Sequence, residues 1–310
     1  MEQTGIEGQA LAAWENHARS WDSTMGDDGN DYFSVLELPA LKRMISGQKR
    51  NRALDLATGN GLVARWLAEE GFSVVATDGA RAMLEHAKAR TTLWYEEGRL
   101  DKGRKISFEL LDVTNKDHWA QFTSSDNLLK DGFDVVAMNM GIMDVHDLEP
   151  LAASLTSLLK QDGCFVATVL HPLFFTSGAR RQITVHEDPA TGQRIIDRSI
   201  LLSQYQNVAP ARQLLFSNDS EHKPPLSFHR SFQDLFAPFF RAGLILDALE
   251  EVNFDDTFCE PSRVRPREWI PNVAQSPVTV IEAKSMIRRS PSIPGISMYL
   301  LAIDYPVVAF

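Results

Sequence analysis

The sequence predicts an α/β protein built on an open, doubly wound and mostly parallel β-sheet. Short apolar runs alternate with amphipathic helical patterns between residues 53 and 170. A glycine turn, Thr58-Gly59-Asn60-Gly61, separates the first apolar run from the first of these helices. A strand, a helix and a second strand within roughly 30 residues form a right-handed unit with parallel strands, which binds ligands at the carboxyl ends of its strands.

The composition is that of a chain which can bury one large core. It has 310 residues, of which 44% are hydrophobic and 23% are charged, and its formal net charge is −10. Since nucleic-acid binders present basic surfaces, we expect no nucleic-acid partner. Two cysteines are too few for a disulfide framework and indicate a reducing compartment. No signal sequence and no apolar run of roughly 20 residues is visible, so we expect a cytoplasmic protein without membrane contact.

Two helical patterns precede the first expected strand. Residues 9–23 and residues 32–45 each space their apolar side chains for one face of a helix. We expect residues 1–50 to form a helical lid, because a pocket at a sheet edge needs a cover that excludes water. Ordinary packing is the alternative role for their aromatic residues. The aromatic candidates for the lid are Trp14, Trp21 and Tyr32.

Residues 51–172 are expected to form the nucleotide-binding core. Apolar and alternating runs predict its strands, and the 3.6-residue period predicts its helices. The expected strands cover residues 53–57, 72–77, 105–111, 132–138 and 164–170. The expected helices cover residues 62–70, 80–90, 116–130 and 148–160.

The alternation of strands and helices stops after His171-Pro172. Residues 173–228 contain two short alternating runs, 182–185 and 195–200, separated by turn residues. These runs predict a hairpin inserted as a substrate cap over the ligand edge of the sheet.

Residues 229–310 are expected to complete the core sheet. They contain a helical pattern at 231–243, a strand at 244–249 and a last strand at 296–305, at or near a sheet edge. Between these strands, residues 270–295 are rich in proline and serine, which predicts a flexible loop.

Carboxylates near the glycine turn narrow the range of ligands. Asp78, after the second strand, can accept hydrogen bonds from a ribose or can cap the next helix. Its distance in sequence from Gly59 is close to the ~20 residues of the dinucleotide fingerprint, so an NAD-dependent oxidoreductase is one candidate. Asp55 inside the first strand favours an ammonium group over a pyrophosphate. Asp112, followed by Val113, offers an acceptor for an adenine amino group beside an apolar surface.

Together, these motifs resemble those of the class I S-adenosylmethionine-dependent methyltransferases. The stretches LDLATGNG, VVATD, LLDV and FDVVAMNMGIMDV resemble the first four motifs of this family. DLEPL, VLHP and FHRSFQDLFAPFFRAGL are similar to a small-molecule subgroup. The resemblance covers most of residues 14–250 and implies a Rossmann-like fold with S-adenosylmethionine as cofactor. One departure is Thr58, where relatives frequently have Cys.

The resemblance also implies which residues surround the cofactor. Residues of the first motif would hold its methionine part, Asp78 its ribose and Asp112 its adenine. Asn139 and Met140 would line the sulfonium side. With the lid aromatics, the expected cofactor residues are Trp21, Tyr32, Asp55, Ala57, Thr58, Gly59, Gly61, Asp78, Gly79, Met83, Asp112, Val113, Asn139 and Met140.

Methyl transfer requires a positioned acceptor and the exclusion of water. If the acceptor is a hydroxyl, a base removes its proton, and His171 and His229 are the candidates. Either histidine could instead fix a turn or cap a helix, and Asp144 could cap the helix that follows it. The histidines and acids show no metal-ligand spacing, so we expect no metal. The candidate substrate residues are Met143, Asp144, Phe174 and Phe175.

The sequence thus predicts methyl transfer from S-adenosylmethionine to a small, hydrophobic acceptor. Oxygen is the expected acceptor atom, and the resemblance suggests a role in secondary metabolism. Two alternatives stay open, an NAD-dependent oxidoreductase and an S-adenosylmethionine-binding cyclase or decarboxylase that transfers no methyl group. We expect a monomer or a homodimer.

Overall fold

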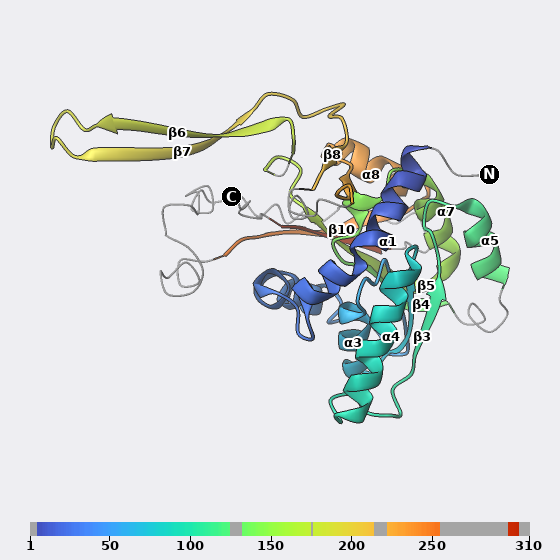
Figure 1. The fold of residues 1–310 in the computed structure, drawn as a ribbon. Coiled ribbons are helices and arrows are strands. Elements are labelled where there is room, and N and C mark those ends of the chain that lie inside the picture. The colour runs from blue at the N-terminus through green and yellow to red at the C-terminus, as the bar shows by residue number, and fades with distance from the viewer. Residues whose placement is uncertain (1–4, 125–131, 175, 214–221, 255–296, 304–310) are drawn as a thin grey trace.

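A seven-stranded β-sheet forms the centre of the protein (Figure 1). The computed structural model describes residues 5–124, 132–174, 176–213, 222–254 and 297–303. The strand order is β10-β11-β5-β4-β1-β2-β3, and every neighbouring pair is parallel. The strands are β1 (Arg52–Leu56), β2 (Ser73–Asp78), β3 (Ile106–Leu110), β4 (Phe133–Met138), β5 (Leu159–Leu170), β10 (Ile245–Val252) and β11 (Ser297–Ile303).

The strand order reverses between β1 and β4, which lie side by side at the centre of the sheet. The crossovers leave these two strands in opposite directions across the sheet, so their carboxyl ends border an open crevice. Both strands are apolar and almost entirely buried, as expected for strands covered on both faces. The predicted Rossmann-like, doubly wound α/β fold is confirmed.

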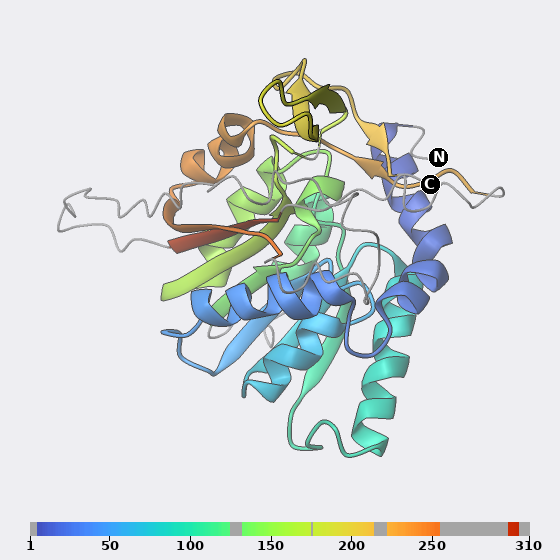
Figure 2. The ribbon, with the colours of Figure 1, turned by 90° about the vertical axis from the view of Figure 1, so that its left-hand side faces the viewer.

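Helices cover both faces of the sheet (Figure 2). The even positions of β1, such as Leu54, pack with α5, α7 and α8, whereas the odd positions, such as Ala53, pack with η1, α2 and α3. This division follows from the alternation of side chains along a strand. The helices are α1 (Ile6–Met25), η1 (Tyr32–Glu37), α2 (Leu38–Met44), α3 (Leu62–Glu69), α4 (Arg81–Glu96), α5 (Lys116–Ser124), η2 (Ile142–Asp144), α7 (Glu149–Leu158) and α8 (Phe232–Arg241).

One detail of the sheet differs from the sequence prediction. β5 begins at Leu159, because the expected turn around Gly163 is an irregularity within the strand. A Cβ atom at Gly163 would lie 2.7 Å from the carbonyl oxygen of Phe133, so a side chain here would clash with β4. The last strand, β11, lies near the edge as expected, one place in from it, between β5 and β10. The loop expected at 270–295 lies outside the described residues.

The predicted hairpin is present, but its predicted position is wrong. Strands β6 (Ala179–Glu187) and β7 (Arg194–Leu202) pair antiparallel with each other in a separate two-stranded sheet. The hairpin extends away from the body to the left in Figure 1 and points at the viewer in Figure 2. Only its base approaches the ligand edge, where short strands β8 (Ala211–Arg212) and β9 (Leu226–Ser227) also pair.

Replacing Phe239 by Ala should destabilise the fold by about 3–5 kcal/mol. Phe239 is 1% exposed and its ring stacks on that of Phe165 in β5, with 5.5 Å between ring centroids, so its loss leaves a cavity between α8 and the sheet. Its neighbour Phe240 is 50% exposed and provides a matched control, for which we expect a loss below about 1 kcal/mol. Urea unfolding of both variants measures the free energy of unfolding that each one loses. Equal losses would contradict the assignment of Phe239 to the core between α8 and the sheet.

Candidate functional site

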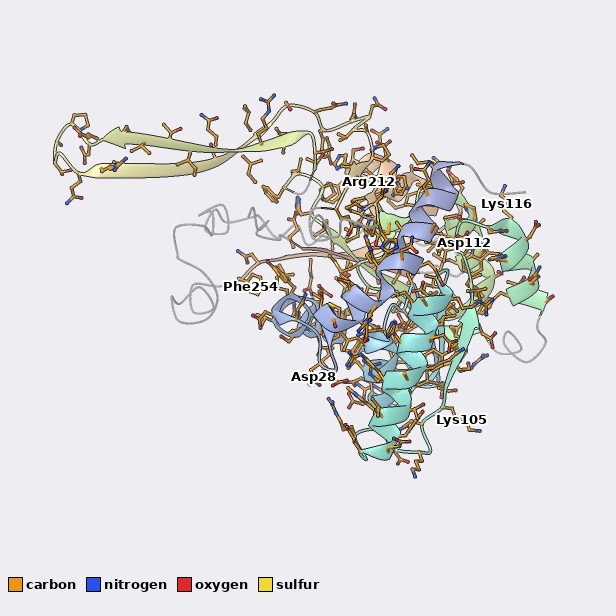
Figure 3. The ribbon with its side chains drawn as sticks, in the orientation of Figure 1. Asp28, Lys105, Asp112, Lys116, Arg212 and Phe254 are labelled. Carbon is orange, nitrogen blue, oxygen red and sulfur yellow. The ribbon has the colours of Figure 1, made fainter. Side chains whose placement is uncertain are left out.

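A cavity of about 670 Å³ opens at the carboxyl ends of the central strands. This volume lies within the usual range for small-molecule sites. Figure 3 shows Asp112 beside α1 at this edge of the sheet, whereas Lys105 lies at the opposite end of β3. The strand-end residues that line the cavity are Ala57, Gly59, Asp78, Gly79, Asp112, Val113, Asn139 and Met140.

The glycine turn has the left-handed backbone that its sequence predicts. The φ angles of Gly59 and Gly61 are 57° and 82°, and even Ala57 has a φ of 52°. A Cβ atom at Gly59 would lie 3.1 Å from Nε1 of Trp21, so the indole ring of Trp21 lies directly on the turn. From below, the buried Arg65 donates from Nη1 to the carbonyl oxygen of Asn60 at 2.7 Å. The turn is therefore fixed from both sides.

Asp78 links the second strand to the glycine turn. Its Oδ2 accepts from the backbone N–H of Gly59 and its Oδ1 from that of Ala80, both at 2.9 Å. Burial raises the pKa of Asp78 to about 6, against the effect of these hydrogen bonds. The backbone N–H of Gly79 is a third donor to this carboxylate, and the side chain lines the cavity. Asp78 can therefore fill both of the roles considered from the sequence, since it binds the backbone before α4 and can also accept from a ligand.

Asp55 lies away from the cavity, contrary to the expectation that it faces the ligand. Its Oδ2 accepts from the hydroxyl of Thr58 at 2.5 Å, and the carboxylate also accepts from the backbone N–H of Ala64. Burial raises the pKa of Asp55 to about 7, opposed by the hydrogen bond from Thr58. Asp55, Thr58 and Gly61 do not line the cavity. Because these residues hold the turn from beneath, their part in binding is indirect.

The part of the cavity beside Asp112 is apolar. Met83 and Val113 line it as expected, together with Leu11 and Leu111, which the motifs did not indicate. Oδ1 of Asp112 accepts from the backbone N–H and the hydroxyl of Thr114, at 2.9 and 2.7 Å. The arrangement offers apolar walls beside one carboxylate.

Helix α1 lies over this side of the cavity. A Cβ atom at Gly79 would lie 2.9 Å from Cδ1 of Leu11, and Trp14 packs edge-on against Trp21 with 5.6 Å between their centroids. Two acidic residues attach the helix to α4. Glu15 accepts from the backbone N–H of Ala82 at 3.1 and 3.2 Å, and Asp22 pairs with the guanidinium of Arg90. Trp14, Trp21 and Tyr32 line the cavity.

A buried network fixes the end of β4. Nδ2 of Asn139 donates to Oε2 of Glu37, and the hydroxyl of Thr168 donates to Oδ1 of Asn139, both at 2.7 Å. The same hydroxyl accepts from the backbone N–H of Met140 at 2.7 Å. Met140 has a φ of 53°, a conformation that side chains rarely adopt. The network thus holds a strained backbone at the cavity wall.

Asp144, at the end of the loop that follows β4, lines the cavity. Its Oδ1 accepts from Nε2 of Gln213 at 2.6 Å. Burial raises the pKa of Asp144 well above its usual value, and the charge of Asp78 adds to this rise. The helix cap considered for Asp144 is supplied instead by Asp147, whose Oδ1 accepts from the backbone N–H of Glu149 at 2.9 Å. Asp144 therefore faces the cavity.

Arg230 holds the loop that carries Met143 and Asp144. Its guanidinium donates to the carbonyl oxygens of Val145 and His146, the latter at 2.9 Å, and to that of Ile142 at 3.3 Å. Burial lowers the pKa of Arg230 to about 10, which leaves it charged at neutral pH. This side chain was not expected as a site residue, because an arginine on carbonyl groups has no sequence signature.

The two candidate histidines have different surroundings. His229 lines the cavity, and its Nε2 lies 2.8 Å from the carbonyl oxygen of Tyr205. Since a carbonyl only accepts, Nε2 carries the hydrogen, and Nδ1 of the neutral ring is left as the basic atom. His171 is 2% exposed and does not line the cavity. Its Nε2 contacts Glu251 and its Nδ1 accepts from the backbone N–H of Leu173 at 3.1 Å, so both nitrogens are occupied.

The remaining substrate candidates have separate outcomes. Met143 and Phe174 line the cavity, whereas Phe175 lies outside the described residues. Within the described residues, no group of three or more His, Cys, Asp and Glu side chains is arranged to hold a metal ion. No described helix has the length and apolar character needed to cross a bilayer.

Comparison with known proteins gives the family. A family model described as a methyltransferase domain matches residues 33–222, which is more than half of the chain. The chain belongs to this methyltransferase family. No curated protein gives a significant sequence match.

Comparison with solved structures gives one match with a TM-score above 0.5 among the three described next. An S-adenosylmethionine-dependent methyltransferase from Mesorhizobium loti is 22% identical, covers 75% of this chain and 89% of its own, and has a TM-score of 0.51. DhpI, in a SAM–HEP complex, is 19% identical over 78% of this chain and 91% of its own, with a TM-score of 0.47. The CcbJ methyltransferase from Streptomyces caelestis is 17% identical over 74% and 86%, with a TM-score of 0.45. The family predicted from the sequence motifs is confirmed by the family match.

Replacing Asp55 by Asn should stabilise the ligand-free methyltransferase progressively as the pH rises. The folded-state pKa of Asp55 lies above its ordinary value of 3.8, so the folded state keeps a proton that the unfolded chain releases, and the wild type loses stability between about pH 4 and pH 7. The variant's free energy of unfolding, relative to wild type, should therefore increase by about 2–3 kcal/mol between pH 5 and pH 8 in urea titrations.

The control for this experiment is Asp117→Asn, which changes an exposed carboxylate on α5 and should give no comparable difference between the two pH values. A relative stability of Asp55→Asn that is constant or falls with pH would contradict the assignment of Asp55 as a buried, proton-retaining residue.

Proposed function

We propose that this methyltransferase transfers a methyl group from S-adenosylmethionine to a hydroxyl oxygen of a small, hydrophobic acceptor. The observation that carries this proposal is the single cavity that joins Asp78 and Gly59 at one end to Asp144 and His229 at the other. A donor held at the first end and an acceptor at the second would meet near Met140. Fold likeness to a protein described as S-adenosylmethionine-dependent supports the donor.

The nucleotide side of the cavity fits this donor. The carboxylate of Asp78 lines the cavity and can accept from the hydroxyls of a ribose. Met83 and Val113 supply apolar walls for a purine, and Asp112 supplies an acceptor for its amino group. At Gly59 the indole of Trp21 lies against the bare backbone of the turn, where a Cβ atom would come within 3.1 Å of its Nε1. Asp55 is assigned no contact with the donor, because it supports the turn from beneath.

The bound donor supplies an electrophilic methyl group, which leaves its sulfur as the new oxygen–carbon bond forms. We assign the proton of the acceptor hydroxyl to Nδ1 of His229, which becomes an imidazolium ring. Nε2–H of this ring already donates to the carbonyl oxygen of Tyr205, and that oxygen stabilises the added charge. The lid indoles Trp14 and Trp21 exclude water from the reacting groups.

The acceptor end has an apolar wall and a polar wall. The apolar wall contains Met143, Leu170 and Phe174, which suit a hydrophobic molecule. The polar wall contains Asp144 and Gln213, which are hydrogen-bonded to each other and can orient a polar group of the acceptor. We extend the proposal to a metabolite-tailoring role. The proposed location is the cytoplasm, because the buried free thiol of Cys164 suits a reducing compartment.

Replacing Asp78 by Ala should weaken binding of S-adenosylhomocysteine by a factor of about 10–100, because two charge-assisted hydrogen bonds to the ribose are lost. Asp78→Asn keeps one acceptor oxygen and should lose less. Asp101→Ala, at an exposed turn, is the control and should bind like wild type. Calorimetric titration gives the dissociation constants. Micromolar binding of NAD without binding of S-adenosylhomocysteine would refute the proposed donor.

Replacing His229 by Gln should lower kcat by a factor of about 10²–10⁴, the usual contribution of a general base. Gln can keep a donor near the carbonyl oxygen of Tyr205 while removing the basic nitrogen, so donor binding should be unchanged. His171→Gln is the comparison and should keep kcat within about threefold, because His171 does not reach the cavity.

Both histidine variants are assayed with acceptors found by screening hydroxylated molecules for a mass gain of one methyl group. Normal turnover by His229→Gln would exclude His229 as the base. Donor consumption without a methylated product would instead indicate a non-methylating enzyme of the same family.

A further inference from the structure

The segment inserted after β5, residues 173–228, brings two arginines to the wall of the cavity. They are Arg180 in β6 and Arg212 in β8. Within the described residues, neither guanidinium group forms an ion pair, whereas Arg43 and Arg90 each pair with a carboxylate. The two positive charges at the cavity are therefore available to a ligand.

The charges of the cavity wall are divided between the core sheet and the insertion. The carboxylates of Asp78, Asp112 and Asp144 lie at or beyond the ends of core strands, whereas both guanidinium groups come from the insertion. These carboxylates accept from backbone N–H groups or from the side chain of Gln213, and so they do not neutralise the arginines. In Figure 3, Arg212 lies higher than Asp112, toward the insertion. An acidic wall suits a cationic ligand, and a basic wall suits an anionic one.

This division matches the two reactants of the proposed methyl transfer. The donor is placed beside Asp78 and Asp112, and it carries a sulfonium and an ammonium group against one carboxylate. The acceptor is placed beside Asp144. Gln213, the residue after Arg212, donates from Nε2 to Oδ1 of Asp144 at 2.6 Å. Arg212 therefore belongs to the side of the cavity that we assign to the acceptor.

The guanidinium group of Arg212 is held so that one of its edges faces no described acceptor. Its Nη1 donates to the carbonyl oxygen of Pro224 at 2.6 Å. The opposite edge, formed by Nε and Nη2, is the edge with which Arg43 binds the carboxylate of Glu250. This edge can bind two oxygens of a carboxylate or a phosphate with parallel hydrogen bonds. The side chain of Arg180 is exposed and can turn toward the same ligand.

We propose that the acceptor carries an oxyanion, a carboxylate or a phosphate group, which Arg212 and Arg180 bind. This inference rests on the proposed function, because it names the substrate class of the same cavity. Met143 and Phe174 receive the apolar body of the acceptor, and the arginines hold its anionic end. A neutral analogue leaves two desolvated guanidinium groups without a partner, so the site discriminates against it.

The test uses a panel of hydroxylated aromatic and aliphatic molecules in matched forms: carboxylic acids, their neutral amides and phosphate esters. Calorimetry measures the binding of each molecule to the full chain saturated with S-adenosylhomocysteine. Mass spectrometry measures methylation in the presence of S-adenosylmethionine. We expect an acid or a phosphate ester to bind and react at least about tenfold better than the matched amide. The comparison of acids with phosphate esters identifies the oxyanion.

Arg212→Gln and Arg180→Gln should each lower kcat/KM for the anionic acceptor by a factor of about 10–100. The matched amide should not lose activity, so the preference for the anion should fall toward one. Simple damage to the cavity would instead lower both activities equally. Arg212→Lys keeps the charge without the planar group and should lie between wild type and Arg212→Gln. Arg194→Gln is the matched control, because Arg194 is an exposed arginine at the other end of the same hairpin, opposite Glu187.

The proposal stands if anions are preferred and the arginine variants lose this preference. It fails if no anion of the panel binds, if amides bind as well as acids, or if the variants keep the preference. It also fails if the variants weaken binding of S-adenosylhomocysteine by about tenfold or more, because the arginines then hold the carboxylate of the donor. Methylation of amides alone would refute this inference and keep the proposed function. Arginine-dependent binding of anions without methylation would refute only the methyl transfer.

Discussion

The carboxylate of Asp78 is the constraint on which the rest of the site depends. It accepts from the backbone of the glycine turn with one oxygen and from Ala80, before α4, with the other. The ends of β1 and β2 are thereby fixed relative to each other before any ligand arrives. Burial disfavours the charged form of this group and raises its pKa, whereas the backbone N–H groups that donate to it act in the opposite direction.

Much of the fold could be predicted from the sequence, because strand and helix periods differ and the crossovers of parallel strands have one hand. The cavity at the strand ends followed from the same topology, and residues such as Val113 and Met140 line it. The direction of a side chain at a strand end was not predictable in this way. Asp55 and His171 are close in sequence to residues that line the cavity. Their side chains nevertheless contact backbone or side-chain partners beneath the cavity wall.

The surroundings of Asp144 show why the remaining part of the site could not be predicted from the sequence. Asp144 follows β4, whereas its partner Gln213 follows β8. Arg230, just before α8, donates to the carbonyl groups of Val145 and His146, which follow Asp144 in the chain. These contacts join segments about 70–90 residues apart in the chain. Neither periodicity nor a motif relates such segments, since their approach depends on how the insertion after β5 returns to the sheet.

The position of α1 has a consequence for the catalytic cycle. With Trp21 on Gly59 and Leu11 against Gly79, the helix covers the backbone that a nucleotide must approach. Exchange of a spent cofactor for a fresh one would then involve a movement of α1, which Asp22 ties to α4 through Arg90. Opening of the helix and methyl transfer would be separate steps of the cycle.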